Sequence, residues 1–309
     1  MNRRRMAFAT ALVSTAALAL TACGGGSDPL DSSSDADSGG SSSSESIIVG
    51  SANFPENELL AEIYAGALEA KGVKVSKKLN IGSREAYIPG LEDGSIDLLP
   101  EYSGNLLSYL DDKATAVSSE DVFAALPEAL PEGLTVLDQS TAEDKDVVTV
   151  TKETADKYSL KSIGDMKGKD LVLGGPPEWK TRPTGVPGFE KNYGVTFKEY
   201  KVLDVGGPLT VNALKNGQVD AADLFSTDPN IIANGWVMLE DPENQFAAQN
   251  VLPIINEEKA SDTVKGALNA VSGVLTTENL SEMMEKVTLE QQEPADVAKE
   301  FLETNKLSS

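Results

Sequence analysis

Residues 91–103 read LEDGSIDLLPEYS, and residues 214–226 read LKNGQVDAADLFS. Both fit the pattern Leu-x-x-Gly-x-(Ile/Val)-Asp-x4-(Tyr/Phe)-Ser, in which Tyr102 corresponds to Phe225. In each copy the glycine is placed to end a helix, and a short strand that carries an aromatic residue follows it. The repetition predicts one supersecondary unit used once in each of two lobes. The alternative is a chance match among common residue types.

The strand ends of the two copies indicate where a ligand binds. In open α/β sheets, ligands lie beyond the carboxyl ends of the strands. If two such ends face each other, Tyr102 and Phe225 lie on opposite walls of one cleft. We therefore expect a ligand site between two α/β lobes.

The chain before the first copy also indicates an α/β fold. Residues 46–52, SIIVGSA, read as a short buried strand, and the next stretch has apolar residues at helical spacing. Asn53 is predicted to cap this helix, with Pro55 in its first turn and Glu56 three residues after the cap. Gly72 is expected to end the helix, and another strand follows.

The N-terminus has the features of an export signal. Residues 1–22 contain three arginines, an apolar run and a short segment of small residues, which predicts a signal peptide. The segment ending at Cys23 resembles a bacterial lipobox, which implies that Cys23 is lipidated and anchors the chain to a membrane. A plain secretory signal is the alternative. Residues 23–46 are mostly Gly, Ser and Asp and predict a flexible tether.

Composition excludes several function classes. With 26 basic and 49 acidic residues, the net charge of −23 disfavours nucleic acid as a partner. The chain has no histidine and one cysteine, which excludes Ser-His-Asp and Cys-His nucleophiles and zinc sites built on His or Cys. Carboxylate-only and Ser-Lys chemistry stay open, but no motif indicates either. We expect neither catalysis nor a metal or other cofactor.

A rigid loop between the two copies carries a candidate anion-binding residue. Residues 171–182, LVLGGPPEWKTR, read as an apolar strand that stops at glycines and leads into a proline-rich loop. Arg182 in this loop has the planar fork that holds a carboxylate through two hydrogen bonds. An ordinary surface arginine is the alternative. Tyr87 and Trp179 are further candidates for the cleft wall.

Several runs together resemble a known family. These runs are VGSANFPEN, GLEDGSIDLLPEYSGN, GGPPEWKTRPTGVPGFEKNYG, ALKNGQVDAADLFSTD and VLPIIN. In this order they are similar to runs in the substrate-binding proteins of ABC importers for quaternary-ammonium osmoprotectants, namely glycine betaine, choline, carnitine and proline betaine. The resemblance covers essentially the whole chain after the tether.

The resemblance implies a two-lobe periplasmic-binding-protein fold of type II, with a ligand cleft between the lobes and a hinge of two crossovers. Lobe I is expected to comprise residues 47–143 and 251–309, and lobe II residues 144–250. The implied function is capture of a small molecule by a monomer and its delivery to separate permease and ATPase subunits. No phosphate-binding loop is present, in agreement with that division of labour.

The resemblance also implies roles for individual residues. Tyr102 and Phe225 match positions of an aromatic cage around the methylated ammonium, where each ring contributes about 1–2 kcal/mol. Arg182 matches the residue that pairs with a betaine carboxylate. Asn105 lies where a threonine often helps to hold that carboxylate.

Other positions depart from the family pattern. Ala52 replaces a lysine, and Asp146 stands where a further tyrosine is often found. A carboxylate there favours a choline-like cation, whereas Arg182 favours a ligand with an anionic end. A flatter polar or aromatic ligand in the same fold is the runner-up interpretation. Gln249 or a neighbour is expected to replace a fourth ring.

Two residues next to the expected cleft have both a structural and a binding interpretation. Asn53 is predicted as a helix cap that also contacts the ligand. Ser226, with Thr227, is predicted to cap the helix after the second copy and to present backbone amides to an anion. A secreted enzyme and a sensory or adhesive lipoprotein are the competing classes of function.

Overall fold

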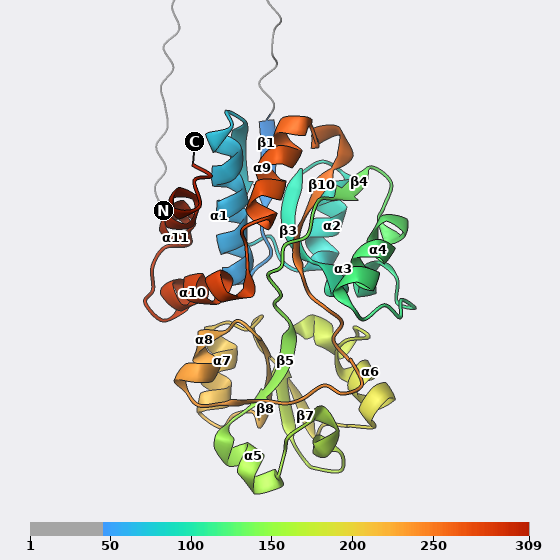
Figure 1. Cartoon of the computed structure of the whole chain (residues 1–309). Coiled ribbons are helices and arrows are strands. Elements are labelled where there is room, and N and C mark those ends of the chain that lie inside the picture. Colours follow the sequence, from blue (N-terminus) through green and yellow to red (C-terminus); the bar gives the residue numbers. More distant parts are fainter. Residues whose placement is uncertain (1–45, 309) are drawn as a thin grey trace, which may run out of the picture. The chain divides into compact units, whose positions relative to one another are not determined.

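The structure is a computed structural model that describes residues 46–308 (Figure 1). Three predictions for the N-terminus lie outside the described residues. They are the signal peptide, the lipidation of Cys23 and nearly all of the tether. Within residues 46–308, no helix has both the length and the apolar character needed to cross a membrane.

The described chain forms two mixed five-stranded sheets with the same strand arrangement. The first has the order β2-β1-β3-β10-β4 and the second β7-β6-β8-β5-β9. The strands of the first sheet are β1 (Ser46–Gly50), β2 (Lys74–Lys78), β3 (Leu98–Tyr102), β4 (Leu134–Val136) and β10 (Val251–Asn256). Those of the second are β5 (Asp146–Val150), β6 (Val172–Gly175), β7 (Glu199–Val202), β8 (Ala221–Phe225) and β9 (Val237–Met238). We call the parts built on these sheets the first and the second lobe.

The two sequence copies occupy equivalent places in the two sheets. Asp97 precedes β3 and accepts a hydrogen bond from the Ile48 amide of the neighbouring strand at 2.8 Å. Asp220 precedes β8 and accepts one from the Val172 amide, also at 2.8 Å. Each strand is preceded by a glycine with positive φ, Gly94 or Gly217. The prediction of one unit used twice is therefore confirmed.

Helices cover both faces of the first sheet. The apolar positions expected in the first helix, among them Leu59, Leu60 and Ile63, are fully buried in one core, together with residues of the C-terminal helices. A second core on the opposite face contains Leu91 and Leu106. The helices of this lobe are α1 (Pro55–Ala70), α2 (Arg84–Glu92), α3 (Ser103–Leu110), α4 (Ser119–Ala129), α9 (Asp262–Ser272), α10 (Thr277–Thr288) and α11 (Pro294–Thr304).

The second lobe is built in the same way from shorter helices. One face of its sheet carries a core that includes Val148, Trp179 and Phe189, and the other a core that includes Leu214 and Leu224. Its α-helices are α5 (Lys152–Tyr158), α6 (Val186–Gly188), α7 (Pro208–Lys215) and α8 (Pro229–Ala233). The predicted α/β class is confirmed.

Two connections join the lobes, one between β4 and β5 and the other between β9 and β10. They lie side by side, because Glu143 and Asn250 form an antiparallel bridge. The Asp144 amide donates to the Gln249 carbonyl at 3.1 Å, close to this bridge. The lobe boundaries predicted after residues 143 and 250 fall within these connections.

Two helix caps differ from the prediction. The N-cap of α1 is Phe54, not Asn53, and it makes no side-chain cap. Glu56 does not form a capping box with Asn53, because its carboxylate accepts hydrogen bonds from the hydroxyls of Tyr102 and Thr227. The predicted cap of α8 by Ser226 and Thr227 is also wrong, since Asp228 caps this helix by accepting from the Asn230 amide at 2.8 Å.

Candidate functional site

A cavity of about 50 Å³ lies between the two lobes, beside the ends of β3 and β8. Six of the residues singled out in the sequence line it: Asn53, Tyr102, Asn105, Asp146, Arg182 and Phe225. We call this cavity the cleft. Ser226 is exposed and does not line it; its hydroxyl donates to Asp144 and accepts from the Lys145 amide. Gln249 is also absent from the lining, and its side chain accepts from the Asn105 amide at 2.9 Å.

Aromatic rings from both lobes meet at the cleft. Phe54 of the first lobe stacks on Phe225 of the second, with ring centroids 5.2 Å apart and planes inclined by 26°. The ring of Tyr102 also lies next to that of Phe54, with centroids 5.9 Å apart. Tyr87 and Trp179 also line the cleft and are almost fully buried. Phe54 packs against both apolar cores of the first lobe and also forms a wall of the cleft.

Both arginines that line the cleft already have carboxylate partners. The Arg182 guanidinium donates two hydrogen bonds to Glu85 of the first lobe, at 3.2 and 2.7 Å. Burial acts to raise the pKa of Glu85, but hydrogen bonds from Arg182 and Ser83 lower it to about 2. Arg84 pairs with the fully buried Glu101 through two hydrogen bonds, at 2.9 and 2.6 Å.

Asp146 and Asn105 form the polar link between the lobes. The side-chain Nδ2 of Asn105 donates to the Asp146 carboxylate at 2.6 Å. Asp146 opens β5 and lies directly opposite Phe225 on β8. Burial raises the pKa of Asp146, while the hydrogen bond from Asn105 and the charges of both arginines oppose that rise. The carboxylate therefore lies beside the aromatic wall.

Two further carboxylates line the cleft and were missed by the sequence interpretation. Asp223 is 1% exposed, and among the described residues neither of its oxygens accepts a hydrogen bond from an N–H group or a hydroxyl; its carboxyl hydrogen-bonds with that of Asp146. One oxygen of Asp144 also lacks such a donor among the described residues. Burial raises the pKa of both carboxyls well above its usual range, and the charge of Asp146 adds to the effect on Asp223. The available signal was a charged residue inside the otherwise apolar strand AADLF.

A buried carboxylate also joins the lobes beside the connections. Glu56 accepts a hydrogen bond from the Tyr102 hydroxyl at 2.9 Å and one from the Thr227 hydroxyl of the second lobe at 2.6 Å. Burial raises the pKa of Glu56. Asp144, whose free oxygen is described above, accepts from the Thr227 amide at 3.0 Å.

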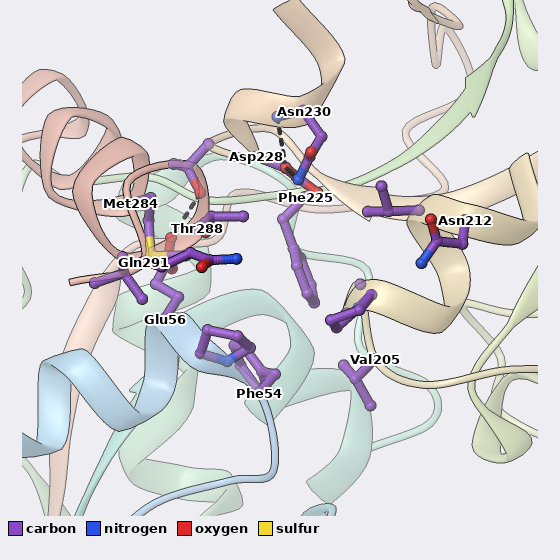
Figure 2. A pocket seen from close by; sticks show the side chains of 17 residues that line it. Phe54, Glu56, Val205, Asn212, Phe225, Asp228, Asn230, Met284, Thr288 and Gln291 are labelled. Carbon is purple, nitrogen blue, oxygen red and sulfur yellow. Dashed lines mark hydrogen bonds between the residues drawn. The ribbon is translucent and has the colours of Figure 1, made fainter. Parts of the chain in front are cut away.

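A second cavity of about 380 Å³ adjoins the cleft (Figure 2). It lies between the start of α1, the loop before α7, α8 and the end of α10. Phe54, Val205 and Phe225 line both cavities, so the stacked rings stand between them. Figure 2 shows Phe225 and Phe54 near the centre of the view and Met284 and Gln291 of the C-terminal part on its left.

The described residues contain no group of three or more His, Cys, Asp or Glu side chains arranged to hold a metal ion. What the cleft offers is aromatic ring faces, two paired guanidinium groups and buried carboxylates. This arrangement is chemically suited to enclosing a small charged molecule.

Comparison with known proteins agrees with the architecture. The model of the substrate-binding domain of ABC-type glycine betaine transport systems matches residues 45–304. The carnitine transport binding protein of Listeria monocytogenes is 28% identical over 276 residues, covering 86% of this chain and 89% of the relative. A glycine-betaine-binding protein of Pseudomonas aeruginosa is 25% identical over 284 residues, covering 87% of this chain and 90% of the relative.

Solved structures show the same fold. A glycine betaine/carnitine/choline ABC transporter structure has a TM-score of 0.67 and 24% identity, covering 85% of this chain and all of the other. An ABC-transporter choline-binding protein in complex with choline has a TM-score of 0.61 and 14% identity, covering 86% and 90% of the two chains. These likenesses confirm the two-lobe binding-protein fold, and the matched family covers almost all of the described residues. The chain therefore belongs to the substrate-binding domain family of ABC-type glycine betaine transport systems.

Proposed function

We propose that this chain is the extracytoplasmic receptor of an ABC importer and that its cleft captures a quaternary-ammonium solute of the choline type. Relatives named for carnitine and glycine betaine support the solute class. Tyr102, Phe54 and Phe225 supply ring faces, which hold a methylated cation that has no strong hydrogen-bond donors.

The proposal of a cationic ligand rests on one observation: the arginines at the cleft are paired, whereas two buried carboxyls are not. Arg84 and Arg182 each donate two hydrogen bonds to a glutamate, so the charge of each guanidinium is already paired. Asp144 and Asp223 instead have oxygens that accept no hydrogen bond from an N–H group or a hydroxyl of the described residues. Burial disfavours the ionised form of these carboxyls, so a bound cation stabilises that form, whereas a betaine carboxylate opposes it.

The remaining parts of the proposal concern the setting of the receptor. It acts as a monomer without covalent chemistry, is anchored through lipidated Cys23, and delivers its solute to permease and ATPase subunits. The two lobes, residues 47–143 with 251–309 and residues 144–250, open and close about the paired connections. The bridge between Glu143 and Asn250 supports this hinge.

Isothermal titration of the purified receptor with choline, glycine betaine, carnitine and proline betaine tests the ligand. We expect choline to bind at least about tenfold more tightly than glycine betaine, a difference of about 1.4 kcal/mol. If none of the four solutes produces heat or a thermal shift, the osmoprotectant assignment is wrong, although the fold is unaffected.

A second candidate is a receptor of the same fold for a small polar or aromatic molecule. Asp146 supports it, because a carboxylate stands opposite Phe225 where the family often has a ring. Native mass spectrometry of receptor purified from its own cells distinguishes the candidates, since a retained ligand is identified by its mass.

A further inference from the structure

We propose that Asp223 is a ligand-binding residue that accepts a hydrogen bond from the solute, so that the receptor selects a quaternary-ammonium solute whose far end carries a hydroxyl or an N–H group. The inference rests on the proposed function and names the part of the solute that the aromatic rings do not recognise.

The position of Asp223 in the sheet places it at the ligand. Asp223 and Phe225 are two residues apart on β8, so both side chains project from the same face of the strand. Farther from the cleft this face is apolar core, formed by residues such as Val150 and Ala221. Asp223 therefore occupies a position on the face of β8 that otherwise packs in the apolar core, and its side chain lines the cleft.

The carboxylate of Asp223 lacks the partners that a structural acid has. Asp97 and Asp220, which precede equivalent strands, each accept a backbone amide. Asp223 is almost as buried as a core residue, yet among residues 46–308 its oxygens accept no hydrogen bond from an N–H group or a hydroxyl, and its carboxyl is bonded to that of Asp146. An unsatisfied buried polar group is costly, and a buried charge more so. A solute that donates to this carboxylate removes that cost on binding.

The neighbouring groups favour an organic donor over the alternatives. Asp144 adds another oxygen that accepts no N–H or hydroxyl hydrogen bond among the described residues, and Asp146 adds a carboxyl that accepts from the Asn105 side chain. Among the described residues these acids do not form a metal-ion site. A quaternary nitrogen alone offers only C–H groups, so it leaves the oxygens of Asp223 unbonded. A hydroxyl or an amine at the other end of the solute supplies the missing donor.

Three trimethylammonium probes that share one end test this inference. Choline has a hydroxyl at its far end, (2-aminoethyl)trimethylammonium has N–H donors, and (2-methoxyethyl)trimethylammonium has an acceptor only. Titration calorimetry of the wild-type receptor is expected to show that choline and the amine bind about tenfold to a hundredfold more tightly than the methoxy compound.

Substitutions at Asp223 assign the preference to this residue. Asp223→Leu keeps the branched shape and removes both acceptors, whereas Asp223→Asn keeps one acceptor. The preference for choline over the methoxy compound is expected to fall to about twofold or less in Asp223→Leu and to an intermediate value in Asp223→Asn. Asp156→Asn is the control, because Asp156 is an exposed acid of the second lobe that does not line the cleft. It should keep the wild-type preference.

The outcomes separate this inference from the proposed function. Equal affinity of the wild-type receptor for choline and the methoxy compound overturns the inference and leaves the proposed function intact. Retention of the full preference in Asp223→Leu overturns the role of Asp223. Failure of all three probes to bind overturns the proposed function, and the inference with it.

Discussion

Arg182 of the second lobe and Glu85 of the first lobe form a two-point ion pair across the mouth of the cleft, with the shorter contact at 2.7 Å. The pair occupies the guanidinium that the family pattern assigns to a solute carboxylate. It therefore links closure of the lobes to the loss of an anion-binding group.

Replacing Glu85 by glutamine should release Arg182. Because the Glu85 side chain is 48% exposed, the pair contributes at most about 1 kcal/mol to closure. The Glu85→Gln receptor should bind glycine betaine more tightly relative to choline than the wild type does, by a few-fold. Calorimetry with both solutes measures this ratio. Asp156→Asn, which breaks the exposed pair with Lys152, should leave the ratio unchanged.

The aromatic walls should contribute directly to affinity. Tyr102→Ala and Phe225→Ala should each weaken binding of the cationic solute by at least about 1 kcal/mol, because each removes a ring face from the cleft. Tyr158→Ala is a suitable control, since this ring lies on α5 outside the cleft lining. Unchanged affinity in both cleft variants would contradict the two-wall model.

The buried acids should make the stability of the receptor depend on pH. Burial raises the pKa of Asp223, so the native state keeps this proton to a higher pH than the unfolded chain does. Its contribution to the free energy of unfolding is present below the unfolded pKa of about 4 and is lost as the pH rises through the native value.

Substitution of Asp223 should remove this loss. At about pH 7, Asp223→Asn without solute should be more stable than the wild type by about 1–3 kcal/mol, because asparagine stays neutral, whereas the buried carboxyl is favoured only in its protonated form. Urea unfolding from about pH 4 to about pH 8 measures the difference. The same substitution at the exposed Asp112 is the control. Equal pH profiles for wild type and Asp223→Asn would argue against a buried charge at this site.

The buried ion pair of Arg84 with Glu101 should be needed for stability of the first lobe. Glu101 is fully buried and also accepts from the Tyr87 hydroxyl at 2.7 Å. Arg84→Met leaves this carboxylate buried without its cation, which should cost about 3–5 kcal/mol. Thermal or urea unfolding gives the value. Lys286→Met, which breaks the exposed pair with Glu300, should cost less than about 1 kcal/mol.

The N-terminal prediction has a separate test. If Cys23 carries the anchor, Cys23→Ala should move the protein from the membrane fraction to the soluble fraction of its own cells. Fractionation with immunoblotting measures this change, and intact-mass analysis of the wild type should show the added lipid. A wild-type protein of unmodified mass in the soluble fraction would favour the plain secretory signal.

Local sequence patterns correctly predicted the helices and helix ends that depend on residues a few positions apart. The apolar spacing of the first helix and the glycines that end helices before β3 and β8 were read correctly, because each depends on neighbours a few positions away. The cap at Asn53 was wrong, since Glu56 is bound instead by Tyr102 and by Thr227, which lies 171 positions away.

By itself, the sequence predicted two α/β lobes and placed Tyr102 and Phe225 at the cleft, because repeated spacing and strand-end chemistry are local properties of the chain. The family followed from the resemblance of several ordered runs. Only the tertiary structure decided which charges are neutralised. Arg182 meets Glu85 from 97 positions away, and Asp223 is buried beside Asp146 without an N–H or hydroxyl donor in the described residues. Burial and ion pairing depend on residues that folding brings together, so the proposed preference for a cation rests on the tertiary structure.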